Sequence, residues 1–190
     1  MNRCSIFKRR RGLLRVVVAI LLIAAPTALT ACRARSATQE VEATIVVRDG
    51  RGRAVRLPRP ARRIAALSPS AVEILFRLGC GARVVLRSKM ANFPPRARSI
   101  PSTDGLRLAA EHIVGFRPDL VLLSHLDPSG VAALEGLGIP VGVFEPRSIE
   151  EVFGDMETLG RLCGASGMRL RQEVATLRHR AEAIDRRVAG

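Results

Sequence analysis

Short apolar runs alternate with helical patterns along the middle of the chain. The apolar runs cover residues 64–67, 84–86, 120–123 and 141–144. Between and after them, stretches at 70–78, 108–116, 129–137 and 148–162 repeat apolar residues at helical spacing. Continuous apolar strands separated by helices are typical of a parallel sheet covered on both faces. The pattern therefore predicts a doubly wound α/β lobe over residues 44–164.

Two further patterns flank this lobe. Apolar and β-branched residues on both sides of Asp49-Gly50 predict an N-terminal β-hairpin with a tight turn. From Leu170 to Val188 apolar residues recur at steps of four and three, with charges at the other positions. This spacing predicts one long helix within residues 165–190 that carries a narrow apolar stripe. Such a stripe needs a partner surface, either in a coiled-coil seam or as a strut between domains.

The N-terminus has the pattern of an export signal. Six basic and no acidic residues precede Cys32, and the apolar run at 16–31 is short for a membrane span. It ends in Leu29-Thr30-Ala31-Cys32, which resembles the bacterial lipobox, whose cysteine carries the lipid. We expect a lipoprotein signal peptide at 1–31, lipid attachment at Cys32 and a polar tether at 32–43. An ordinary signal peptide and an uncleaved anchor are the alternatives.

This reading places the protein outside the cytoplasmic membrane, where it is lipid-anchored and faces the periplasm or the cell exterior. The net charge of +14 comes from 31 Lys+Arg against 17 Asp+Glu. Without the six basic residues of the signal, the balance is 25 against 17, or +8. Aromatic residues make up only 3% of the chain, with no Trp or Tyr, and the arginines are scattered. These features argue against nucleic acid as a partner.

The sequence contains no catalytic signature. A nucleophile elbow, a phosphate-binding loop with its lysine and a dinucleotide-binding glycine motif are all missing from it. We therefore expect no enzyme. Cys80 and Cys163 show no metal-ligand spacing. They could pair in an oxidising compartment, but two unpaired thiols are the favoured interpretation.

Four longer segments carry a family resemblance. They are RIAALSPSAVEILFRLGCGARVV, FPPRA, FRPDLVLLS and LGIPVGVFEPRSIEEVFGDMETLGRLCG, in this order. Their order and spacing resemble the ferric-siderophore/cobalamin periplasmic binding proteins, the substrate-binding subunits of ABC importers, over about residues 44–190. The resemblance implies two α/β lobes joined by a long helix, with the ligand between them. The segment 165–190 would be that helix, and the second lobe is expected to be absent from this chain.

The resemblance and the predicted sheet place the ligand beyond the carboxyl ends of the strands. Ser68-Pro69-Ser70 follows the first of these strands. Ser70 is expected to cap the next helix together with Glu73, leaving other N–H groups of the first turn free for an anionic or acceptor-rich ligand. The alternative is that Ser-Pro-Ser only caps the helix.

Two other loops complete the predicted ligand-binding set. In the loop after the second strand, Met90 and Asn92 stand where the family commonly has a tyrosine and an acidic or polar residue. Phe93 stands at the second aromatic position of the family's pattern. After the strand at 120–123, no second histidine or carboxylate lies near His125 at metal spacing, so we expect no metal site. The predicted ligand-binding residues are Ser68, Pro69, Ser70, Ser88, Lys89, Met90, Asn92, Phe93, Ser124 and His125.

The resemblance also implies partners. Glu111 matches the family's surface glutamate that docks onto the permease, although an ordinary solvated charge is the alternative. The expected ligand is a ferric siderophore, haem or cobalamin, and no resident cofactor is expected. The basic excess leans towards an anionic iron complex, and the lack of Trp and Tyr leans against a large corrinoid or haem face. A different class of function is a single-lobe adaptor that pairs with another chain through its C-terminal helix.

Overall fold

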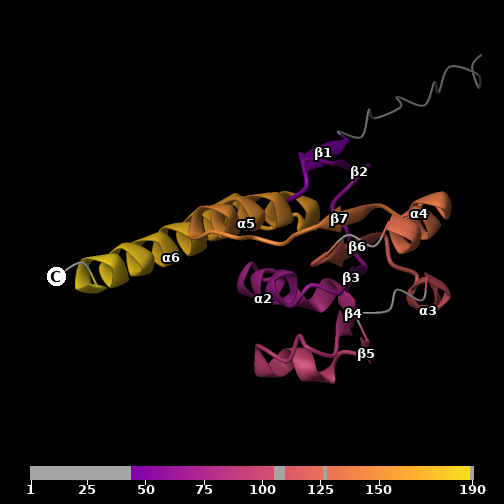
Figure 1. Ribbon diagram of the computed structural model, residues 1–190, viewed down its shortest axis with the longest axis horizontal. Coiled ribbons are helices and arrows are strands. Elements are labelled where there is room, and N and C mark those ends of the chain that lie inside the picture. Colours follow the sequence, from indigo (N-terminus) through magenta and orange to yellow (C-terminus); the bar gives the residue numbers. More distant parts are fainter. Residues whose placement is uncertain (1–43, 105–109, 126–127, 189–190) are drawn as a thin grey trace, which may run out of the picture. The chain divides into compact units, whose positions relative to one another are not determined.

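The computed structural model describes residues 44–104, 110–125 and 128–188 (Figure 1). The expected signal peptide, the tether and Cys32 lie outside these residues. Within them, five parallel strands form one sheet in the order β5-β4-β3-β6-β7. The strands are β3 (Ile64–Ala66), β4 (Val84–Ser88), β5 (Ser102–Thr103), β6 (Leu120–Leu123) and β7 (Val141–Val143).

Alternate residues of the central strands build two separate cores. Leu120 and Leu122 of β6 belong to the cluster formed with α2 (Pro69–Arg77) and α5 (Ile149–Cys163). Val121 and Leu123 belong to the other cluster, formed with α3 (Ala110–Gly115) and α4 (Pro128–Gly136). Because successive side chains of a strand point to opposite faces, β6 is apolar throughout and is covered on both sides. The predicted doubly wound α/β lobe is confirmed.

The strand order fixes where the sheet changes direction. From β3 the chain moves outward to β4 and β5, and it then crosses back to β6 and β7 on the other side of β3. The switch point therefore lies between β3 and β6, where Ile64 pairs with Leu120 and Ala66 with Leu122. In open α/β sheets a ligand commonly binds at such a point.

One strand was not expected. No strand was predicted at residues 102–103, but Ser102 and Thr103 form β5 and pair with Arg87 and Ser88 of β4. The other strands were predicted from apolar runs, and these two residues are polar, so no pattern indicated a strand here. β5 is an edge strand, which explains how it tolerates polar residues on both faces.

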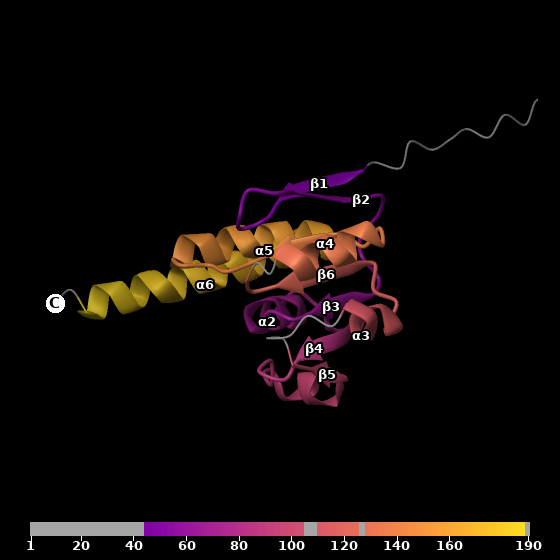
Figure 2. The ribbon, with the colours of Figure 1, turned by 45° about the vertical axis from the view of Figure 1, so that its right-hand side comes forward.

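The N-terminal hairpin is confirmed, but its turn is longer than predicted. β1 (Ile45–Arg48) and β2 (Ala54–Leu57) pair in antiparallel fashion, and residues 49–53 connect them. The carboxylate of Asp49 accepts hydrogen bonds from the N–H groups of Arg51 at 3.0 Å and Arg53 at 2.8 Å. This side chain, rather than a two-residue turn, shapes the loop. Figure 2 shows the hairpin lying along α5, where Arg161 donates to the carbonyl of Val46 at 3.1 Å.

The last helix, α6 (Gly167–Val188), is 22 residues long and has the predicted stripe. Leu170, Val174 and Leu177 pack against the core that α2 and α5 form. Farther along, Ile184 is 60% exposed and Val188 81% exposed. The stripe is thus covered only along the first half of the helix. Figure 1 shows the second half of α6 extending beyond α2 and α5. None of the helices in the described ranges is both long and apolar enough to cross a membrane.

Candidate functional site

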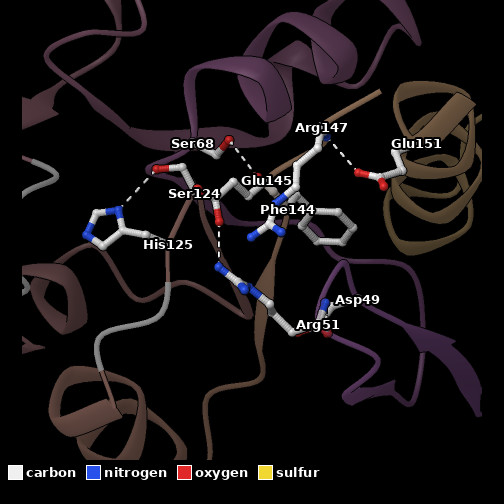
Figure 3. Close-up of polar contacts among 9 residues, drawn as sticks. All are labelled: Asp49, Arg51, Ser68, Ser124, His125, Phe144, Glu145, Arg147 and Glu151. Atoms are coloured by element: carbon white, nitrogen blue, oxygen red, sulfur yellow. Dashed lines mark hydrogen bonds and ion pairs between the residues drawn. The ribbon is translucent and has the colours of Figure 1, made fainter. Parts of the chain in front are cut away.

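The carboxyl ends of the five parallel strands meet at one edge of the sheet, and we call the loops there the rim. Going across the sheet, the rim consists of Lys89 to Phe93 after β4, Ser68 to Ser70 after β3, Ser124 and His125 after β6, and Glu145 to Arg147 after β7. The predicted ligand-binding residues therefore come from loops on the same edge. Figure 3 shows the part of the rim near β6 and β7.

Ser68, and not Ser70, caps α2. The Ser68 hydroxyl accepts from the N–H of Ala71 at 3.4 Å, and it lies 2.9 Å from the Ser70 hydroxyl and 3.5 Å from the carbonyl oxygen of Phe144. Ser68 is fully buried, so its role is structural. Because Pro69 at the first helical position has no N–H, the Ser70 N–H is the one donor of the first turn left without a partner among the described residues.

A buried arginine holds the loop after β4 in place. The Arg87 guanidinium donates to the carbonyls of Ala97 at 2.9 Å and Ser88 at 3.0 Å, which satisfies a charge that is only 8% exposed. Ser88 is also buried, and its hydroxyl accepts from the N–H of Met90 at 3.2 Å. No pattern in the sequence indicated this role for Arg87.

Four of the predicted side chains in this loop are open to solvent. Met90 is 75% exposed and Phe93 57% exposed, while Lys89 and Asn92 are also exposed. A groove of about 570 Å³ runs between α2, the segment 93–96 and α6. It shares Phe93 with the rim but none of the serines, so it is a neighbouring feature and not the rim itself.

Ser124 and His125 lie beside the switch point and are both half-buried. The Ser124 hydroxyl is 3.3 Å from Nδ1 of His125 (Figure 3). In the described part of the chain no carboxylate is bonded to this imidazole, which a Ser-His-Asp relay would require. The described residues also hold no group of three or more potential metal ligands. This pair can donate and accept hydrogen bonds to a bound molecule.

The loop after β7 was missed as part of the site. Oε2 of Glu145 lies 2.6 Å from Nη2 of Arg51 in the hairpin loop, and both side chains are partly exposed (Figure 3). Arg147 is exposed next to them. Glu145 and Arg147 follow the apolar run at 141–144 just as Ser68-Pro69-Ser70 follows the run at 64–67. The expectation that residues after a strand lie at the carboxyl edge of the sheet could therefore have found both. No sequence signal places Arg51 there.

The hairpin loop reaches the rim because it docks onto β7. The N–H of Gly50 donates to the carbonyl of Val143 at 2.8 Å, and the N–H of Val143 donates to Oδ2 of Asp49 at 3.1 Å. Asp49 is buried and uses both carboxylate oxygens, one for its own loop and one for β7. This anchoring brings Arg51 within reach of Glu145.

Among the described residues of the rim, Lys89 and Arg147 are exposed cations, while Glu145 is paired with Arg51 of the hairpin loop. Hydroxyl, amide and imidazole groups lie between the cations. Such a surface suits a small molecule rich in acceptors or negative charge. The predicted docking residue Glu111 is exposed in the first turn of α3. No described contact joins it to the rim.

Three known proteins illustrate what the chain is similar to. It is 28% identical over 126 residues to the ABC transporter substrate-binding lipoprotein YvrC of Bacillus subtilis (strain 168), covering 64% of this chain and 40% of that protein. It is 28% identical over 131 residues to the vitamin B12-binding protein of Yersinia pestis (strain Pestoides F), covering 63% of this chain and 46% of that protein.

The third is the solved structure of an ABC-type Fe3+-hydroxamate transport system from Saccharomonospora viridis DSM 43017. It matches with a TM-score of 0.59 and 27% identity, over 75% of this chain and 56% of that one. The chain thus spans about half of the length of these proteins. Their names describe transport and binding proteins and not enzymes. In addition, a family model described as periplasmic binding protein matches residues 64–189. The chain therefore belongs to the periplasmic binding protein family.

Proposed function

We propose that the chain is the ligand-binding lobe of an exported, lipid-anchored substrate-binding protein of an ABC importer, and that it captures a metal chelate. The main support is the rim, where loops from several strands bring polar and cationic side chains to one edge beside the switch point. The names of the relatives point to vitamin B12 and a ferric hydroxamate as ligands of this family.

Within this class, an anionic ferric siderophore fits the rim best. Lys89 and Arg147 are exposed cations, which favour a negatively charged chelate. Haem and cobalamin remain alternatives, but both present large flat faces for which aromatic platforms are useful. Among the described residues of the rim, Phe93 is the exposed aromatic side chain.

One lobe covers a ligand from one side only. Small-molecule sites usually enclose most of the ligand surface, so the rim alone should bind weakly. In the proposed mechanism a second lobe, joined through α6, closes over the ligand. The loaded protein then docks onto the permease with Glu111 as one contact.

A single-lobe adaptor is the second candidate. Leu170, Val174 and Leu177 pack back onto the lobe, as expected for a connecting helix. Ile184 and Val188, however, are exposed and continue the same stripe. This outer part of α6 is the feature that favours pairing with another chain. Sedimentation of the full chain tests it, because an adaptor should associate through α6 and Ile184→Glu should abolish that association.

Ligand titration tests the main proposal. Since the chain has no Trp or Tyr, calorimetry is a better measurement than intrinsic fluorescence. The full chain should give a saturating curve with a ferric tris-catecholate, and weaker or flat curves with haem and cyanocobalamin. Lys89→Ala should weaken the binding about threefold to tenfold, whereas Arg186→Ala at the exposed end of α6 should not. Flat curves for all ligands would refute capture by this lobe.

One localisation experiment and one capture experiment test the lipid anchor and the docking to the permease. Cys32→Ser should move the protein from the membrane fraction to the soluble fraction, and recovery in the membrane fraction would contradict lipid anchoring at this residue. For docking, Glu111→Ala should weaken capture of the chain by purified permease subunits. Glu157→Ala, an exposed glutamate on α5, is the matched control and should leave capture unchanged.

A further inference from the structure

The two cysteines of the lobe meet although they are 83 positions apart along the chain. Cys80 follows the end of α2, and Cys163 is the last residue of α5. Sγ of Cys80 lies 3.4 Å from the carbonyl oxygen of Cys163. The side chains are 4% and 0% exposed, and both are free thiols in the structure. The sequence alone did not indicate that they would be neighbours.

The backbone around each cysteine is firmly placed. The N–H of Cys80 donates to the carbonyl of Leu75 at 2.8 Å, which closes the end of α2. Cys163 belongs to the last turn of α5, and the left-handed Gly164 ends that helix. Arg169, near the start of α6, donates to the carbonyl of Arg77 at 2.9 Å. The thiols therefore meet at a fixed place, where α2, α5 and the start of α6 converge.

We propose that Cys80 and Cys163 form a disulfide bond in the exported protein. The proposal rests on the proposed function only for the oxidising compartment, where structural disulfides persist. The oxidant is a disulfide, such as oxidised glutathione or that of a thiol–disulfide oxidoreductase. One cysteine thiolate breaks the oxidant's S–S bond, forms a mixed disulfide and releases one thiol. The second cysteine thiolate then displaces the other thiol, so the oxidant takes up the two electrons that the cysteines lose.

Cys80 is the better first nucleophile. The neighbouring Cys163 lowers the pKa of Cys80 to about 7, with Arg83 and Arg169 acting in the same direction against the effect of burial. The neighbouring Cys80 and burial raise the pKa of Cys163. Since both sulfurs are buried, the oxidant reaches Cys80 during folding or a transient opening. Cys163 then resolves the mixed disulfide as the helices close.

Such a bond would tie the end of α2 to the end of α5. Cross-linking residues this far apart removes much conformational freedom from the unfolded chain, so the effect on stability should be large. It would also fix the first turn of α6 against the lobe. A connecting helix would then have a rigid base on this side.

Peptide mapping tests the proposal on the full chain with Cys4→Ala and Cys32→Ala, which leaves only the two cysteines in question. The chain is refolded in a glutathione redox buffer or in a reductant, and the folded monomer is isolated. It is then unfolded, alkylated and cut with trypsin. Trypsin releases LGCGAR, which contains Cys80, and LCGASGMR, which contains Cys163. The redox-buffer sample should give these two peptides as one linked species, and the reduced sample should give both alkylated.

The melting temperature provides the second measurement. The oxidised protein should melt about 10 °C higher than the reduced protein, whereas the Cys80→Ala variant should show no difference between the two conditions. Recovery of both peptides fully alkylated from folded, oxidised monomer would overturn the proposal. Neither measurement uses a ligand, so the outcome of the disulfide test does not depend on whether the ligand titration succeeds.

Discussion

Nη2 of Arg51 lies 2.6 Å from Oε2 of Glu145, although the two residues are 94 positions apart. Arg51 comes from the hairpin and Glu145 from the loop after the last strand of the sheet. The pair stands at the rim with both side chains partly exposed, so water and salt weaken it. Glu145 neutralises a cation that an anionic ligand could otherwise use.

Replacing Glu145 with Gln should strengthen the binding of an anionic chelate. The amide keeps the shape of the side chain but frees the charge of Arg51, so the affinity for a ferric tris-catecholate should rise about threefold to tenfold. Cyanocobalamin, which has no net charge, should respond little. Calorimetry measures both, with Glu157→Gln on α5 as the control. Equal changes for the charged and the neutral ligand would contradict an electrostatic role.

Asp49 should be important for stability. Asp49→Ala removes acceptors from the N–H groups of Arg51, Arg53 and Val143, and should lower the free energy of unfolding by about 2–4 kcal/mol. Asp49→Asn should also destabilise the fold, because an amide cannot accept hydrogen bonds on both sides. Urea denaturation measures the loss. Asp185→Ala on the exposed face of α6 is the control, and a similar loss there would show that the effect is not specific.

Stability should fall as the pH rises through about 6, because of Asp155. This carboxyl is 8% exposed, and its Oδ2 has no hydrogen-bond partner among the described residues. Burial raises its pKa from 3.8 to about 6, with Glu151 and Asp49 adding repulsion. The folded state therefore favours the protonated form of Asp155. Its stabilising contribution to the free energy of unfolding is complete below about pH 4 and is lost as the pH rises past about 6.

Asp155→Asn tests this dependence. The variant should be more stable than the parent protein at pH 7.5 by on the order of 2 kcal/mol, and the difference should shrink towards pH 4. Urea denaturation across this pH range gives the two curves. Glu157→Gln, two positions away and exposed, should not change the slope. Parallel curves for Asp155→Asn and the parent would rule out Asp155 as the source.

Two glycines of the same region should respond in opposite ways to alanine. Gly164 has a φ of 62°, and an added Cβ would lie 2.8 Å from Cβ of Pro60, so Gly164→Ala should cost about 2–3 kcal/mol. Gly154 lies inside α5 with open space around it, so Gly154→Ala should stabilise by about 0.5–1 kcal/mol. Thermal unfolding compares the pair, and equal effects at both positions would contradict this account.

The strands of the sheet interior could be predicted because each is an apolar run buried on both faces. The β6 prediction, 120–123, matches the observed strand. The edge strand β5 could not be found this way, since Ser102 and Thr103 need no apolar neighbours. Helix α5 was predictable from Ser148, which caps it. The Ser148 hydroxyl accepts from the N–H of Glu151 at 3.1 Å, and Oε2 of Glu151 accepts from the N–H of Arg147 at 2.6 Å.

The site was less predictable than the fold. Strand ends could be placed on one edge because parallel strands all point the same way, but whether a side chain faces solvent depends on the local turn. Ser68 and Ser88 turn inward to cap and brace their loops, while Lys89 and Asn92 face outward. Arg51 depends on contacts between Asp49 and Val143, which are far apart in the sequence. Such contacts leave no periodic pattern.

β7 is the outermost strand on its side of the sheet, and the hairpin loop takes up both main-chain groups of Val143. An edge strand with unpaired main-chain groups is a template on which a second molecule can add its own strand, which can start aggregation. Because Gly50 and Asp49 already bond to Val143, the carboxyl end of this edge cannot pair with another strand. The small hairpin therefore also protects the protein against aggregation through β7.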